Sequence, residues 1–253
     1  MKVVLSPAKA IDLSKVLVTK EVSIPHFIDE AEGLVKKLKK FSSKKIGAMM
    51  HLSKDLSDLN QNRYQNWEKA TALSEEVGQV SAIFNGEVYR GLDALSFDAE
   101  ELKIAQDKIR ILSGLYGVLK PMDVVFPYRL EMGTRWEVTP TKANLYKFWG
   151  TKLADFLNQE NKDGVLINLA STEYFKAIDK KTINGRIITP SFKEFKNGEY
   201  KIVMVFAKRA RGMMARYIVK NDINNPEDLK SFNIGGYRFD ENLSSENDWV
   251  FTR

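Results

Sequence analysis

Apolar and polar positions follow helical and strand-like patterns that change along the chain. A short apolar run at residues 2–6 predicts a buried strand. Helical periodicity follows over residues 27–40, then in a second run capped by Ser42 and Ser43, and in a third run from Ser53. The N-terminal part of the chain is therefore predicted to hold one strand followed by three helices.

The remainder of the chain adds further helices, strands and two hairpins. The clearest signal is an Asn-Gly turn between two alternating β-rich runs, because this pair favours a two-residue hairpin loop. The predicted elements are helices at 98–108 and 144–158, a strand at 164–170, a hairpin from 186–196 and 199–207, a helix from about Arg209 to Lys220, and a small hairpin at 236–251. Because no clean βαβαβ order emerges, we predict an α/β or mixed α+β fold. Residues 1–253 should form a single compact domain with a mixed sheet and surrounding helices.

Composition excludes several classes of chemistry. The chain has no cysteine, so a disulfide framework, a thiolate zinc site, an iron–sulfur cluster and a peroxidatic thiol are impossible. It has two histidines and no H-E-x-x-H or E-x-x-H motif, so neither a metal nor a cofactor is predicted, although an all-oxygen metal site leaves no readable spacing. Phosphate-loop, dinucleotide-binding and nucleophile-elbow motifs are also absent. With no signal peptide and no long apolar segment, we expect a cytoplasmic protein without membrane contact.

Charge is distributed unevenly along the chain. The formal net charge is +6, from 39 basic and 33 acidic residues. Residues 33–54 and 200–221 contain basic but no acidic side chains, whereas residues 222–253 are rich in acids. This segregation predicts a positive surface region for an anionic partner. For residues 33–54, a solvated helix face explains the lysines equally well.

A glycine-containing segment suggests one way to bind that partner. The sequence IRILSGLYGVLKP fits a helix-hairpin-helix element, in which a turn brings backbone N–H groups close to a DNA phosphate. Leu112 and Leu115 would pack the hairpin, Gly114 and Gly117 would allow the close approach, and Lys120 would add charge. Two glycines in an ordinary tight loop are the alternative.

A basic helix is the second candidate binding element. In the predicted helix, Arg209, Arg216 and Lys220 fall within about 40° of one another, opposite an apolar stripe. Lys208 and Arg211 lie near the strand-to-helix junction, where a helix N-terminus also favours anions. Because arginine suits planar contacts with phosphate, this segment is predicted to bind a polyanion.

Three polar loops complete the candidate site. Each follows an apolar, strand-like run, and ligand groups of α/β proteins gather at such positions. The loops are residues 6–9, 127–133 and 168–176. We expect Lys9, Arg129 and Lys176 to line one cleft together with the basic residues at 208–211. Glu131 and Glu173 would either pair with these bases or serve as acid–base groups.

At these residues the chain resembles the YaaA peroxide-stress protein family along its whole length. The motifs that carry the resemblance are LSPAK, LSGLYGVLKPMD, PYRLEMGTR, LYKFWG, INLAS-x-EYFK and AKRARGMMARYI, in this order. The resemblance implies a cytoplasmic bacterial protein of unusual fold that limits peroxide damage and is associated with lowered free intracellular iron. It also implies DNA binding through a helix-hairpin-helix-like element at Leu112–Lys120 and through a basic cleft. The cleft residues that it implies are Lys9, Arg129, Lys176, Lys208, Arg209 and Arg211.

The leading hypothesis is a damage-limiting protein that binds duplex DNA, either regular, distorted or damaged, without a typical catalytic site. One alternative is a DNA-repair lyase, in which Lys9 would form a Schiff base beside Glu131 or Glu173. The other is a small-molecule enzyme that acts on a nucleotide or phosphate ester in the same cleft. No catalytic residue follows from the resemblance.

Overall fold

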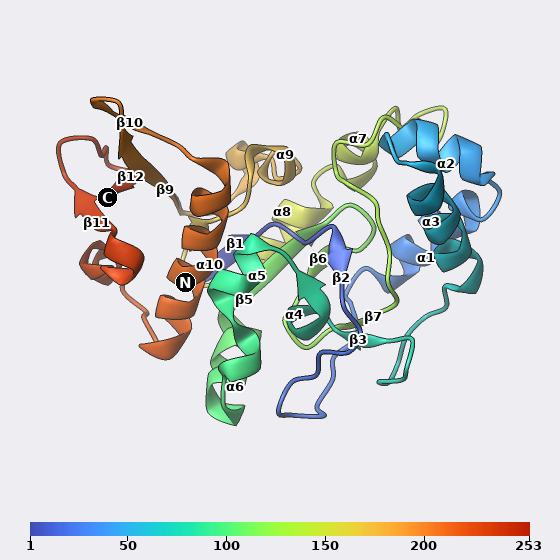
Figure 1. Cartoon of the computed structure of the whole chain (residues 1–253), viewed down its shortest axis with the longest axis horizontal. Helices are drawn as coiled ribbons and strands as arrows, with labels where there is room; N and C mark the ends of the chain where they lie inside the picture. Colours follow the sequence, from blue (N-terminus) through green and yellow to red (C-terminus); the bar gives the residue numbers. More distant parts are fainter.

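A mixed sheet forms the centre of the computed structural model, which describes residues 1–253. Across the sheet lie β11 (Arg238–Asp240), β12 (Asp248–Thr252), β9 (Arg186–Lys196), β8 (Val165–Asn168), β1 (Lys2–Leu5), β5 (Ile109–Ser113) and β6 (Gly117–Leu119), and β10 (Glu199–Lys201) extends β9 as a hairpin. The five strands from β12 to β5 are parallel, while β6, β10 and β11 pair antiparallel with their neighbours. The parallel strands therefore all end at one edge of the sheet (Figure 1).

Helices cover the sheet and extend it on one side. They are α1 (Ile28–Leu38), α2 (Ser43–Met50), α3 (Lys54–Asn66), α4 (Val80–Ile83), α5 (Glu87–Leu92), α6 (Ala99–Lys108), α7 (Leu145–Trp149), α8 (Lys152–Glu160), α9 (Thr172–Phe175) and α10 (Met204–Lys220). Short 3-10 turns lie at Ala94–Ser96, Lys180–Thr182, Pro226–Ser231 and Ile234–Gly236, and two small ladders pair β2 (Ala10–Ile11) with β4 (Phe84–Asn85) and β3 (Gly78–Gln79) with β7 (Val124–Val125). Helices α5, α6 and α10 pack together over the sheet, α8 lies behind it, and α1 to α3 form a separate lobe (Figure 1).

One continuous apolar core joins these layers. It contains 68 buried residues and includes side chains from every strand of the parallel part of the sheet. Val3, Val4 and Leu5 in β1 are all fully buried, as expected for a parallel strand covered on both faces. The predicted α/β fold with a mixed sheet is therefore confirmed. No helix in the structure is both long enough and apolar enough to cross a membrane.

Most predicted elements are confirmed. The residues that cap α2 and α3 explain why the starts of these helices could be predicted from the sequence. The Ser42 side chain accepts a hydrogen bond from the N–H of Lys45, and the Ser53 side chain accepts one from the N–H of Leu56. Each bond satisfies a backbone donor that the first helical turn leaves free. Both predicted hairpins, at β9–β10 and β11–β12, are also present.

Two predicted boundaries are wrong. The second strand of the first hairpin ends at Lys201 rather than at 207, and α10 begins at Met204 rather than at Arg209. Its first turn carries exposed apolar side chains, which prolonged the strand-like alternation. The predicted helix at 144–158 is two helices, because Gly150 has a left-handed φ of 54° and ends α7.

The helix-hairpin-helix prediction is also wrong, because β5 and β6 form a tight β-hairpin. Ile111 pairs with Leu119, and Ser113 pairs with Gly117, whose φ of 68° allows the turn. The flanking sequence is apolar and β-branched, which suits a fully buried strand better than a short helix. Gly117 therefore serves to turn the chain within the core.

A close backbone contact fixes α10 against α5. A Cβ atom added to Gly212 would clash with the carbonyl oxygen of Val88, and one added to Gly91 would clash with the carbonyl oxygen of Arg209. Only glycine at both positions lets the two helices approach this closely. The contact sets the height of α10 over the sheet and therefore the position of its basic residues.

Substitution of Gly212 should separate the two helices. We expect Gly212→Ala to lower the free energy of unfolding by about 1–3 kcal/mol, because its methyl group meets rigid backbone. Gly33→Ala in α1 is the matched control, since an added Cβ there has no neighbour within 4 Å. It should raise stability by about 0.5–1 kcal/mol through helix propensity. Urea denaturation of both variants measures the two effects, and equal effects would contradict the role of the contact.

Candidate functional site

Three loops meet at the edge of the sheet where the parallel strands end. Ser6 follows β1, and its Oγ accepts a 2.9 Å hydrogen bond from the N–H of Ser171, which follows β8. From the third loop, the N–H of Gly133 donates a 3.0 Å hydrogen bond to Oε1 of Glu173. We call the surface formed by loops 6–9, 127–133 and 168–176 the carboxyl-edge site, since ligands of α/β proteins bind at such edges.

One carboxylate oxygen in the carboxyl-edge site is shared by two cations. Oε1 of Glu131 lies 3.0 Å from both Nε and Nη2 of Arg129, and 3.3 Å from Nζ of Lys9. The Glu131 side chain is 13% exposed, whereas that of Lys9 is 64% exposed. The hydroxyl of Tyr64 in α3 donates a hydrogen bond to the Arg129 carbonyl and holds this loop in place. Two positive charges facing one negative charge leave the cluster positive.

Buried tyrosines form the floor of the carboxyl-edge site. The hydroxyl of Tyr89 donates a 3.0 Å hydrogen bond to the Ser6 carbonyl, and that of Tyr128 lies 2.6 Å from Oγ of Ser113. Burial raises the pKa of Tyr89, of Tyr128 and of the neighbouring Tyr174 above the ordinary value. These hydroxyls therefore stay protonated near neutral pH and position the loops through hydrogen bonds.

Lys176 borders the same surface, at the end of α9. Its ammonium lies 5.3 Å from the ring centroid of Tyr146, within the range of a cation–π contact. The Tyr146 hydroxyl in turn donates a 3.0 Å hydrogen bond to the carbonyl of Glu173. Lys176 forms no ion pair with an acid of the chain, so its charge remains available.

Helix α10 reaches the carboxyl-edge site through α5. The Nε of Arg209 donates a 2.8 Å hydrogen bond to Oε2 of Glu87, the first residue of α5. The preceding Gly86 packs against the loop after β1, because a Cβ atom on it would lie 3.5 Å from Cβ of Ala8. Arg209 therefore stands next to the loop that carries Lys9.

Arg211 and Lys208 differ from Arg209 in having no acidic partner. Lys208 is exposed and Arg211 is half-buried, and neither side chain forms a hydrogen bond or ion pair with the chain. Burial lowers the pKa of Arg211, but a guanidinium remains charged at physiological pH. A half-buried charge without a partner costs free energy, which an external anion would offset.

The other two basic residues of α10 are engaged elsewhere. Arg216 donates hydrogen bonds from Nη1 to the carbonyl of Asp93, at 3.0 Å, and to Oγ of Ser96, at 2.7 Å. Lys220 lies 2.5 Å from Oε1 of Glu101 in α6. Both side chains attach α10 to its neighbours. The two side chains do share one edge of α10, as predicted, but acidic residues from distant segments of the chain pair with them.

The segment predicted as a DNA-binding hairpin is buried beneath the carboxyl-edge surface. Leu112, Gly114, Leu115 and Gly117 are buried in the β5–β6 hairpin, so the expected contact between their backbone and a phosphate is sterically blocked. Gly114 is needed for packing, because a Cβ atom there would clash with the carbonyl of Leu130. This contact supports the loop that holds Arg129.

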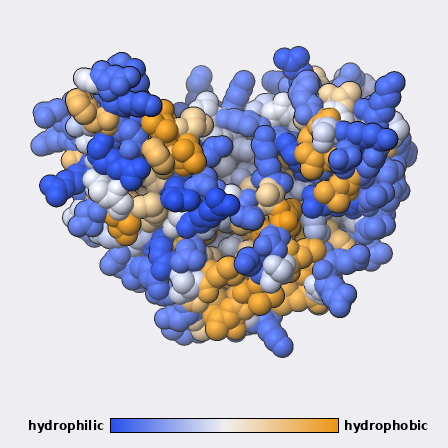
Figure 2. Space-filling view, in the orientation of Figure 1, coloured by the Kyte–Doolittle hydropathy of each residue, from blue (hydrophilic) through white to orange (hydrophobic).

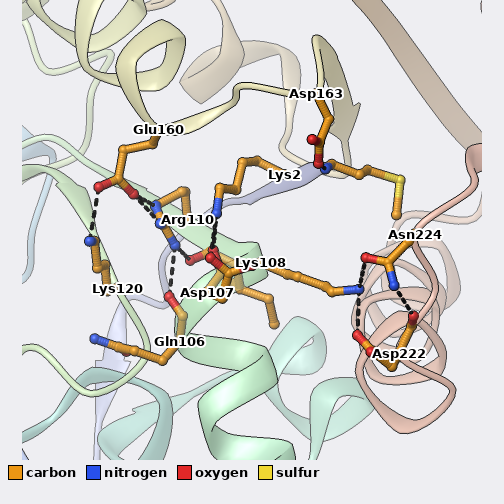
Figure 3. Close-up of polar contacts among 12 residues, drawn as sticks. Lys2, Gln106, Asp107, Lys108, Arg110, Lys120, Glu160, Asp163, Asp222 and Asn224 are labelled. Atoms are coloured by element: carbon orange, nitrogen blue, oxygen red, sulfur yellow. Dashed lines mark hydrogen bonds and ion pairs between the residues drawn. The ribbon is translucent and has the colours of Figure 1, made fainter.

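Lys120 lies at the opposite edge of the sheet, where β5 begins. Its Nζ is 3.0 Å from Oε1 of Glu160, whose Oε2 accepts hydrogen bonds from Nε, at 2.9 Å, and Nη2 of Arg110 (Figure 3). The antiparallel return of β6 carries Lys120 to this edge. Lys120 therefore takes part in an ion-pair cluster far from the other candidate residues.

The molecule is hollowed between two lobes, one formed by β9, β10 and α10 and the other by α1 to α3, and both lobes carry hydrophilic residues with some hydrophobic ones among them (Figure 2). Residues 1–243 match the family model described as peroxide stress protein YaaA. The chain belongs to this family. It is similar over its whole length to UPF0246 proteins of Colwellia psychrerythraea, with 47% identity and 99% of that protein covered, and of Flavobacterium johnsoniae, with 46% identity and 100% covered. A UPF0246 protein of Clostridium beijerinckii is 48% identical over 98% of its length.

Sequence patterns did not indicate Arg63, a further basic residue beside the carboxyl-edge site of this YaaA-family chain. Arg63 belongs to α3 and precedes Tyr64, which binds the Arg129 carbonyl. Its side chain is half-buried and forms no hydrogen bond or ion pair within the chain. Nothing in its surroundings could have identified it, because α3 is a polar helix in which one arginine is unremarkable.

Substitution of Glu160 tests whether the cluster of Arg110, Lys120 and Glu160 stabilises the fold. Arg110 is 2% exposed, so removing the charge of Glu160 leaves a buried guanidinium without compensation. We expect Glu160→Gln to lower the free energy of unfolding by about 3 kcal/mol. Glu100→Gln is the control, since the Glu100–Lys103 pair is exposed, and its effect should stay within about 0.5 kcal/mol. Urea denaturation at pH 7 measures both.

The same pair predicts a pH dependence. Burial raises the pKa of Glu160, but the hydrogen bonds and charges of Arg110 and Lys120 outweigh burial and hold the pKa below its ordinary value. A carboxylate with a lowered folded-state pKa stabilises the fold above its unfolded pKa, which is about 4.3, and loses this effect as the pH falls through the folded value. The stability difference between the wild type and Glu160→Gln should shrink below about pH 4. A constant difference down to acid pH would contradict this assignment.

Proposed function

We propose that this protein binds DNA in the response to peroxide stress, holding the sugar–phosphate backbone at the carboxyl-edge site. The observation that carries the proposal is the half-buried Arg211, which has no acidic partner and lies on the helix that borders this site. Arginine matches phosphate geometry with its planar, forked donors. The membership in a peroxide-stress family supports the physiological setting.

The balance of charges around the site supports a polyanion rather than a single small anion. The cations are Lys9, Arg129, Lys176, Lys208, Arg209 and Arg211. Only two carboxylates, Glu131 and Glu87, form ion pairs with members of this group. The surplus charge comes from loops and helices that are distant in sequence, and so it extends over a surface. Such a surface suits successive phosphates along a strand.

Backbone binding also offers a physical route to protection. A protein that neutralises phosphates releases the cations condensed on DNA. We propose that ferrous ions are among the cations displaced, so that fewer of them react with peroxide next to the sugars. In this proposal, bound protein reduces damage by occupying the backbone.

The salt dependence of binding tests the proposed contacts. Because Glu131 and Glu87 offset part of the charge, we expect three to five phosphate contacts and a slope of log K against log salt of roughly −3 to −4.5. Arg211→Ala should flatten this slope by about one unit. Arg238→Ala on β11 removes an equal charge from an exposed, unpaired arginine at the far edge of the sheet, and should leave the slope unchanged. Fluorescence anisotropy with a labelled duplex measures all three.

Two results would refute the proposal. A wild-type slope near zero would mean that phosphates do not carry the binding. Equal flattening by Arg211→Ala and Arg238→Ala would mean that net charge alone, rather than contact at the carboxyl-edge site, determines affinity.

A further inference from the structure

A small cavity adjoins the carboxyl-edge site on the side of α3. Its volume is about 200 Å³, and its walls include Leu13, Leu59, Asn62, Arg63, Phe126 and Pro127. Pro127 opens the loop that carries Arg129, and Arg63 precedes the tyrosine that binds the Arg129 carbonyl. The cavity therefore continues the proposed DNA-binding surface rather than forming a separate site.

The walls of the cavity combine flat apolar surface with unused hydrogen-bonding groups. Leu59, Phe126 and Pro127 supply the apolar part. The carboxamides of Asn62 and Asn66, which also line the cavity, form no side-chain hydrogen bond within the chain. A carboxamide presents a donor and an acceptor side by side, which is the pattern that matches the edge of a nucleobase.

Arg63 gives the cavity a positive border without compensation. Burial lowers the pKa of this guanidinium, and the like charge of Arg129 lowers the pKa further. Glu76 also lines the cavity but forms no ion pair with Arg63. The carboxylate of Glu131 in the adjoining loop binds Arg129 and is shared with Lys9. The Arg63 guanidinium at the border of the cavity thus has no carboxylate bound to it, and a phosphate would supply the missing negative charge.

We propose that the cavity and Arg63 form a subsite for a single nucleotide, with the base in the cavity and its phosphate at Arg63. Cavities for drug-sized ligands measure about 300–1,000 Å³, so the smaller volume here suits one base rather than an entire nucleotide. In DNA the base must leave the stack to enter, at a small cost where it is mispaired. This DNA source rests on the proposed function, whereas a free nucleotide is the other source of the same chemistry.

The first experiment uses a free nucleotide as the probe. Wild-type protein should bind deoxyadenosine 5′-monophosphate saturably below about 1 mM in calorimetric titrations. Leu59→Trp should fill the cavity and weaken this binding by at least about tenfold. Leu56→Trp is the matched control on the same helix, because Leu56 is 39% exposed and Leu59 is 43% exposed. Unlike Leu59, Leu56 does not line the cavity. Arg63→Ala should weaken binding of the nucleotide and of inorganic phosphate alike.

The second experiment distinguishes the two sources. A duplex carrying 2-aminopurine at a mismatch should gain fluorescence when the protein draws the base out of the stack, and Leu59→Trp but not Leu56→Trp should abolish the gain. Nucleotide binding without this gain would support the subsite and assign it to free nucleotides. If the duplex binds but neither probe responds, or if both tryptophan variants behave alike, the subsite is refuted while the proposed function stands. If the duplex does not bind at all, the proposed function fails and the free-nucleotide titration alone decides the subsite.

Discussion

The backbone contact between α5 and α10 determines where half of the cations of the candidate site lie. Gly91 and Gly212 allow the two helices to touch through their main chains, and this closeness brings Arg209 within reach of Glu87. Glu87 begins the helix that abuts the loop after β1, so the same contact brings α10 to the carboxyl-edge site. Without it, the cations of α10 and those of the loops would belong to separate surfaces.

Features that depend on neighbouring residues could be predicted from the sequence. Ser42 and Ser53 cap the next turn of chain, and the Asn-Gly pair bends two residues, so these signals are complete within a short window. The convergence of the loops after β1 and β8 also followed from sequence, because parallel strands end at a common edge. Charge runs located Arg209 and Arg211 for the same local reason.

Features that depend on partners far along the chain could not be predicted. Arg216 and Lys220 shared the acid-free window of Arg211, yet Asp93 and Glu101 bind them from segments more than a hundred residues earlier. Arg63 is the opposite case. It was not predicted as a binding residue, but the tertiary fold leaves its side chain half-buried and unpaired. The hairpin of β5 and β6 was misassigned because its glycines suit a turn between helices and a turn between strands equally well.

The sharing of Glu131 by Arg129 and Lys9 has a consequence for the kinetics of binding. The carboxylate acts as an internal surrogate for phosphate, holding both cations in an arrangement ready for an anion before any ligand arrives. An incoming phosphate must compete with this resident group, and the resident group reoccupies the cations whenever the phosphate leaves. In the proposed complex with DNA, Glu131 would therefore favour release of the phosphate, because it is already in place to re-form its ion pairs with Arg129 and Lys9.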